Sequence, residues 1–118
     1  MARIADRLAA SSILPADAGR ALLVGRVWLE GDTAGPSPVL VRGADLLELS
    51  SLAPTVAQLL DLDELPQRLR GAAKLPVAAG LQQALSASAP GGRGARLLAP
   101  LDLQAIKASG VTFVASLL

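Results

Sequence analysis

The alternation of apolar and polar positions is clearest between Ala21 and Leu29, and it predicts a β-strand. Successive side chains of a strand point to opposite faces of the sheet, so this segment divides into two sets. Gly25 falls in one set and Arg26 in the other. Each set also contains apolar side chains: Leu23, Val27 and Leu29 in the first, and Leu22, Val24 and Trp28 in the second. Because both faces are partly apolar, we expect this strand to be central in its sheet.

Two further strands are expected at 38–42 and 45–49, after a loop at 31–36 that is rich in glycine. Gly43 lies in the turn between these two strands, where a positive φ causes a glycine no strain. Pro36 and Pro38 suit the start or the edge of a strand, because proline lacks the N–H group that a ladder requires. The three strands together predict an antiparallel meander.

Short helices are expected in the middle of the chain. Thr55 and Gln58 have the spacing of a capping box, a hydroxyl followed three residues later by an amide. A second helix is expected at 63–70, because acidic residues stabilise the start of a helix and basic residues its end. A third is expected at 81–86. Two interpretations of residues 1–13 remain open, a short frayed helix and a loosely held extension.

The C-terminal stretch contains two β-type runs that are separated by a compact segment at 101–109. The first run, 97–99, stops at Pro100, and the second, 111–114, follows Gly110. No glycine, proline or polar cluster ends the chain, so we expect its last apolar side chains to be exposed and to favour self-association. The whole pattern predicts an α+β fold. It consists of a small antiparallel sheet, built from the three-stranded meander plus the C-terminal strands, with short helices on one face.

Composition and charge narrow the classes of function. The 118 residues carry a net charge of +1, and the only aromatic residues are Trp28 and Phe113. Basic residues are scattered and lack an aromatic platform, so nucleic-acid binding is not expected. A sequence without cysteine forms neither disulfides nor thiolate metal sites. Its apolar runs are far shorter than the roughly 20 residues that span a bilayer, so we expect a cytoplasmic protein without a membrane partner.

The absence of histidine, cysteine and tyrosine restricts catalytic chemistry, because it removes Ser–His and Cys–His pairs and the common zinc ligands. Carboxylates remain, in two clusters: Glu30 with Asp32, and Asp61 with Asp63 and Glu64. The first cluster lies in a loop, and the second lies at an expected helix start, where acids stabilise the helix dipole. We therefore expect no catalytic residue and no metal site in this chain. The glycine-rich run at 91–94 lacks the Lys-Ser/Thr of a phosphate-binding loop and is interpreted as a linker.

Three phrases occur in the order LPADAGRALLVGRVW, GPSPVLVRGADLLELSSLAPTVAQLL and LLAPLDLQAIKASGVTF. In this order they resemble the N-terminal domain of the fumarylacetoacetate hydrolase superfamily. The chain is most similar to the branch that dehydrates 2-keto-3-deoxy sugar acids such as the xylonate and arabinonate derivatives. The resemblance covers residues 14–118 and implies an N-terminal domain there, preceded by an extension at 1–13. It also implies that the catalytic domain is missing from this chain.

The resemblance locates the chemistry outside this sequence. In the superfamily, carboxylates of the catalytic domain hold a divalent cation, usually Mg²⁺, and a mobile lid carries an acid/base carboxylate soon after the GVTF-like segment. Thr112, Phe113 and Ser116 correspond to the approach to this lid, so the resemblance makes them the substrate-proximal residues of this chain. The alternative is that they belong to a strand that only completes its own sheet.

Two functional hypotheses from different classes follow. In the first, the chain is a non-catalytic scaffold domain of a metal-dependent lyase or hydrolase. It would bind no cofactor itself and would partner a catalytic domain of the same family in cis or in trans. In the second, it is a stand-alone structural or interaction module that docks through its apolar C-terminus. A coding sequence that continues after Leu118 into an acidic lid segment would favour the first.

Overall fold

The first predicted strand forms β1 (Leu23–Leu29) in the computed structural model, which describes residues 3–110. β1 pairs antiparallel with β2 (Gly35–Arg42), and β2 pairs antiparallel with β3 (Asp45–Glu48). Gly43 adopts a φ of 62° in the tight turn between β2 and β3, as the sequence indicates. The antiparallel meander is therefore confirmed.

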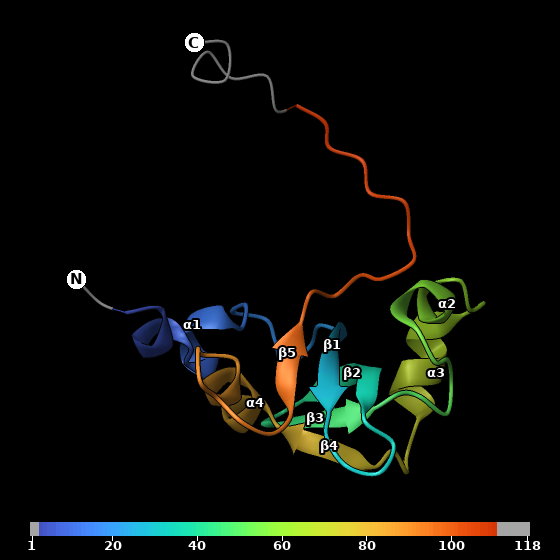
Figure 1. Cartoon of the computed structure of the whole chain (residues 1–118). Coiled ribbons are helices and arrows are strands. Elements are labelled where there is room, and N and C mark those ends of the chain that lie inside the picture. Colours follow the sequence, from blue (N-terminus) through green and yellow to red (C-terminus); the bar gives the residue numbers. More distant parts are fainter. Residues whose placement is uncertain (1–2, 111–118) are drawn as a thin grey trace.

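Two edge strands complete a curled five-stranded sheet of order β4-β3-β2-β1-β5 (Figure 1). β5 (Arg96–Leu98) pairs antiparallel with β1 and confirms the first C-terminal run. β4 (Val77–Gly80) pairs antiparallel with β3, with a register shift between Leu46 and Leu47, and it is not predicted by the sequence. Its only β-branched residue is Val77, so pairing with β3 rather than local preference makes this segment extended. The predicted α+β class is confirmed.

The two prolines lie near the start of β2, which begins three residues earlier than expected. Pro36 and Pro38 pair with β1, whereas the pairing of β2 with β3 begins only at Val39. The Pro38 carbonyl accepts a hydrogen bond of 2.9 Å from the backbone N–H of Leu49. The nitrogen and the oxygen of a strand residue point to the same side, so the Pro38 nitrogen faces β3. The pairing of β2 with β3 begins only at the next residue, so no ladder hydrogen bond requires an N–H group at Pro38. An interior strand therefore accommodates both prolines.

The described residues also form four short α-helices and one 3-10 turn. These are α1 (Ala10–Ile13), α2 (Val56–Leu60), α3 (Leu65–Gly71), α4 (Leu81–Ala87) and the turn Ile4–Arg7. The sequence predicts α2 and α4 closely. α3 begins at Leu65 rather than at residue 63, because Glu64 has a φ of 57° and a left-handed residue cannot continue a right-handed helix.

The N-terminal segment is held to α4 by one side chain. Gln82 donates from Nε2 to the Leu8 carbonyl and accepts at Oε1 from the Ala10 N–H, both at 2.9 Å. Leu8 and Leu14 are half-buried against the core. Of the two interpretations of residues 1–13, the helical one is correct for 4–7, which form a 3-10 turn, and for 10–13, which form α1.

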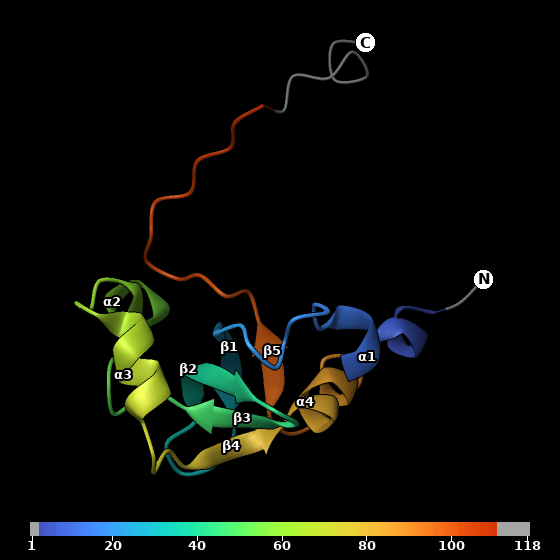
Figure 2. The same ribbon diagram turned by 180° about the vertical axis from the view of Figure 1, so that it is seen from behind.

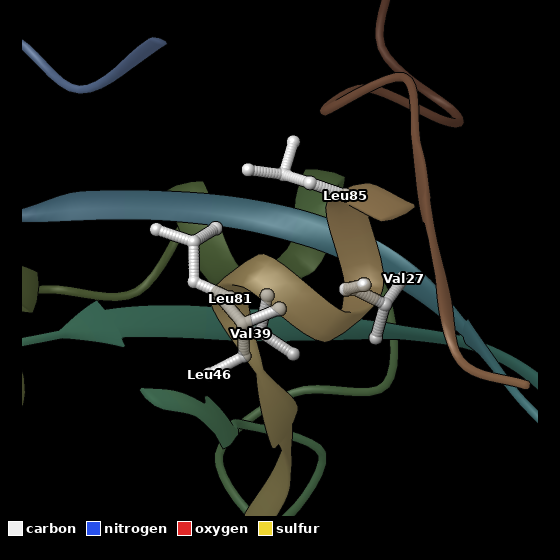
Figure 3. Close-up of a cluster of buried hydrophobic side chains, with 6 residues drawn as sticks. Val27, Val39, Leu46, Leu81 and Leu85 are labelled. Atoms are coloured by element: carbon white, nitrogen blue, oxygen red, sulfur yellow. The ribbon is translucent and has the colours of Figure 1, made fainter. Parts of the chain in front are cut away.

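Apolar cores lie on both faces of the sheet, so the expectation of helices on one face is wrong. The first core joins strand residues to the inner face of α4: Val27, Val39 and Leu46 from the strands, and Leu81, Ala84 and Leu85 from the helix (Figure 3). The second lies between the opposite face and the α2–α3 pair: Leu40, Leu47, Leu49, Ala53, Leu59 and Leu69. Alternate residues of β2 serve opposite cores, which is why β1 and β2 carry apolar side chains on both faces.

The chain leaves the sheet after β5 as an extended segment, residues 99–110, which we call the strap (Figures 1 and 2). The expectation of a compact segment at 101–109 is wrong. Leu103 and Ile106 are 76% and 72% exposed, because no described element lies beside them to bury them. The second C-terminal run, 111–114, lies outside the described residues. Within residues 3–110, no helix has the length and apolarity needed to cross a membrane.

Candidate functional site

The N-terminus of α2 is where the strap contacts the body of the domain. Thr55 Oγ1 accepts a hydrogen bond of 3.1 Å from the Gln58 N–H, as the capping box predicts. The Thr55 hydroxyl donates to Gln58 Oε1 at 2.9 Å, so the Gln58 side chain does not bind the Thr55 backbone N–H as it would in a complete capping box. Two N–H groups of the first turn, those of Val56 and Ala57, are left for another acceptor.

Asp102 of the strap supplies that acceptor. Its Oδ2 accepts from the Val56 N–H at 2.8 Å, and its Oδ1 accepts from the Ala57 N–H at 3.0 Å. Oδ1 also accepts from the Leu103 N–H at 2.7 Å, while the Gln104 side chain accepts from the Asp102 N–H at 2.7 Å. A carboxylate that accepts several N–H bonds forms charge-assisted hydrogen bonds, which are shorter and stronger than neutral ones.

A second contact holds the strap three residues earlier. Arg26 Nε of β1 donates to the Ala99 carbonyl at 2.8 Å, just after β5 ends. The strap is therefore fixed to the edge of the sheet at Ala99 and to α2 at Asp102. Both contacts join segments that lie far apart in the sequence, so together they form a clamp that crosses the end of the sheet.

The pKa of Asp102 is lowered from its ordinary value of 3.8. Partial burial raises this pKa, but the N–H groups of Leu103, Val56 and Ala57 and the positive charge of Arg26 lower it by more. The carboxylate therefore remains charged in acid that would protonate a free aspartate. Each of its hydrogen-bond donors favours the charged form.

We expect the stability that Asp102 contributes to be constant at neutral pH and to disappear only in strong acid. A depressed pKa gives full stabilisation above the unfolded value of 3.8, and the stabilisation is lost as the pH falls through the lower folded value. Urea unfolding of the wild type and Asp102→Asn between about pH 7 and about pH 2 measures the difference. Asp32→Asn, in an exposed loop, is the control. A difference that vanishes well above pH 3.8 would contradict the expectation.

The predicted substrate-proximal residues, Thr112, Phe113 and Ser116, lie outside the described residues, so their role stays a prediction. The acids Asp61, Asp63 and Glu64 are exposed and lie in the short connection between α2 and α3. In the part of the chain that the structure describes, no three residues with histidine, cysteine or carboxylate side chains are grouped as a metal site would require.

An open hollow of about 570 Å³ lies at the end of the sheet beside the 31–35 loop. Glu30 and Glu48 line it, but Glu30 is paired with Arg96 at 3.6 Å and Glu48 accepts from the Ser50 hydroxyl at 2.6 Å. Ser37, which also lines it, is buried and donates only to the adjacent Pro38 carbonyl, at 3.4 Å. The two carboxylates and the Ser37 hydroxyl that line the hollow are therefore already engaged within the domain.

Sequence reasoning missed the residues that connect the elements. Arg42 of β2 donates from Nη2 to the Leu69 carbonyl and from Nη1 to the Ala72 carbonyl, both at 3.1 Å, and so caps the end of α3. Arg26 and Asp102 were likewise not singled out. An aspartate soon after Pro100 is a signal for a local turn, but nothing in the sequence indicates that its carboxylate reaches α2.

Comparison with protein-family models, curated proteins and solved structures finds no match to this chain.

Proposed function

We propose that this chain is the non-catalytic N-terminal scaffold domain of a metal-dependent enzyme of the fumarylacetoacetate hydrolase superfamily. The enzyme would be a cytoplasmic dehydratase, or alternatively a hydrolase, of 2-keto-3-deoxy sugar acids. Its catalytic domain would hold Mg²⁺, which stabilises the enolate formed when the substrate loses a proton. The present domain would support that site from outside, in cis or in trans, without binding a cofactor of its own.

The observation that carries the proposal is the contact between two of the phrases on which the resemblance depends. APTVAQLL, the end of the second phrase, contains the whole of α2, and LLAPLDLQAIKASGVTF contains the last two residues of β5 and the whole strap. Asp102 of the third phrase binds the N–H groups of Val56 and Ala57 in the second. Phrases that are far apart in the sequence thus form one structural unit, as expected for a domain that prepares the path of the chain toward a catalytic domain.

The exposed strap is compatible with this role and also favours a second candidate. Leu103 and Ile106 are 76% and 72% exposed and lie three residues apart on the strap, so a partner that packs there removes apolar surface from water. In the scaffold role, the catalytic domain covers them. In the second candidate, a stand-alone interaction module, a separate protein or a second copy of this chain covers them.

The purified chain should not turn over 2-keto-3-deoxy sugar acids, with or without Mg²⁺. The physical reason is that its described carboxylates are dispersed, whereas enolate stabilisation needs a metal held by several converging oxygen ligands. A coupled assay for the new carbonyl group that loss of water creates, run with Mg²⁺ and again with a chelator, measures this. Turnover that depends on the metal and disappears on chelation would contradict the non-catalytic role.

A second measurement separates the two candidates. The chain is mixed with the catalytic domain of a 2-keto-3-deoxy sugar-acid dehydratase from which its own N-terminal domain has been removed. The scaffold role predicts a complex by analytical ultracentrifugation, weakened by Leu103→Lys with Ile106→Lys. The matched control is Gln67→Lys with Gln83→Lys, which adds the same charge at exposed helical positions. The interaction module is favoured by a different result: the chain forms no such complex but associates with itself, and the same strap substitutions abolish this self-association.

A further inference from the structure

The direction of the strap is determined at one residue. The Arg26 contact at Ala99 lies beside β5 and leaves the strap free to turn, whereas Asp102 carries it across the end of the sheet to α2 (Figures 1 and 2). Beyond Gln104, the described residues 105–110 are exposed and make no hydrogen bond to the body of the domain. Within the described residues, Asp102 is thus the last one that a hydrogen bond fixes to the body of the domain.

We propose that Asp102 is a positioning residue that latches the strap to α2 and sets the direction in which the chain leaves this domain. Its two oxygens have separate tasks, because Oδ2 holds the Val56 N–H and Oδ1 holds the Ala57 N–H. Removal of the carboxylate breaks both bonds and leaves the strap attached only at Ala99. The strap then rotates about that point, and the orientation of Leu103 and Ile106 relative to the sheet is lost.

The latch is distinct from the capping of α2 itself. Thr55 satisfies the Gln58 N–H from within the helix start, and this contact does not involve the strap. Loss of the Thr55 hydroxyl weakens α2 but leaves the Asp102 bonds available. Loss of Asp102 weakens α2 and also frees the strap. The two side chains therefore separate a helix-stabilising role from a positioning role.

The consequence for a following domain depends on the proposed function, but the latch does not. If a catalytic domain follows the strap, the Asp102 contact limits the orientations in which the two domains meet. If an unrelated partner binds the strap, the same contact presents Leu103 and Ile106 in a fixed direction and lowers the entropy cost of binding. The test below uses this chain alone and measures no activity. Its failure would show that Asp102 does not set the direction of the strap, whereas the scaffold role is tested separately by the complex with a catalytic domain.

The natural absence of cysteine allows spin labels to be attached only at chosen positions. One label is placed at Ala105→Cys on the strap, and the other at Gln83→Cys on α4 or at Gln67→Cys on α3, all three exposed. Distances are measured by pulsed dipolar spectroscopy, and amide exchange of Val56 and Ala57 is measured by NMR. The side-chain series at position 102 is Asp, Asn and Ala, and the matched control is Thr55→Val.

With Asp102 present, each label pair should give one narrow distance peak, and Asp102→Ala should lose that peak. In Asp102→Ala, exchange of the two amides should become about tenfold faster, the factor expected for the loss of one hydrogen bond to a charged group. Asp102→Asn keeps one acceptor oxygen and a similar volume, so it should remain folded and give an intermediate width. Thr55→Val should keep the narrow peak. An unchanged peak in Asp102→Ala, or equal broadening in Thr55→Val, would overturn the proposal.

Discussion

Leu46→Ala should lower the free energy of unfolding by about 2–5 kcal/mol, the range for a leucine truncated in a packed core. Leu46 is fully buried on β3, in the core that α4 covers. Its neighbours in that core are aliphatic side chains fixed on strands and on one helix, so they cannot close the cavity completely. Urea denaturation followed by circular dichroism measures the effect.

The matched control is Leu60→Ala, the same chemical change at a site on α2 that is 51% exposed. We expect a change within about 0.5 kcal/mol there, because little buried area is lost and alanine favours the helix. Since domains of this size are stable by only about 5–15 kcal/mol, Leu46→Ala is expected to leave a considerable unfolded population on warming. Equal effects of the two substitutions would contradict the assignment of Leu46 to the core.

Gly92→Ala should be the most damaging change outside the two cores. A Cβ at Gly92 would overlap the Ala87 carbonyl oxygen and would lie only 2.7 Å from the Ala87 Cα. These are backbone atoms at the end of α4, so no side-chain rotation relieves the clash, and either the helix end or the 88–95 loop must move. We expect a loss of about 1–3 kcal/mol, the usual cost of forcing extra volume into a packed site.

Gly71→Ala is the control for this second substitution. Gly71 ends α3, and a Cβ there meets no atom within 4 Å. Alanine at this position should be neutral or stabilise the domain by up to about 1 kcal/mol, because it favours the helix and restricts the unfolded chain. Thermal unfolding of both variants measures the contrast. If Gly92→Ala were as stable as Gly71→Ala, the close approach of the loop to α4 would be wrong.

The same glycine shows where a sequence pattern is ambiguous. The run at 91–94 is typical of a flexible linker, and Gly91 and Gly94 do adopt positive φ values of 83° and 92°. Gly92 has no such φ, and its role is to let the loop approach α4. Composition indicates that a glycine-rich segment can turn, but it does not reveal which glycine is needed for space and which for backbone conformation.

Much of the sheet was predictable because its signals are local. The two apolar faces of β1, the Gly43 turn and the Thr55 cap each depend on residues within a few positions of one another. β4 was not predictable for the opposite reason. Its extended conformation follows from pairing with β3, which lies about 30 residues earlier, and its sequence contains little β preference of its own.

The candidate site was predictable only in outline. The resemblance to a known family directs attention to the C-terminal stretch, yet it points to Thr112, Phe113 and Ser116 rather than to Asp102. Nothing local distinguishes Asp102 from the other acids as a contact of α2, because the N–H groups that it reaches on this helix lie 45 and 46 residues earlier. Only the folded path of the strap brings them together.

The position of β5 at the edge of the sheet has a consequence for synthesis on the ribosome. β1 is made early, but the strand that covers its outer edge at Arg26–Trp28 emerges about 70 residues later. At typical translation rates of roughly 5–20 residues per second, the edge waits for several seconds. An uncovered edge invites pairing with other chains, and charged side chains oppose such pairing. Arg26, which later holds the strap at Ala99, lies on that edge from the beginning and supplies the charge while the nascent chain is incomplete.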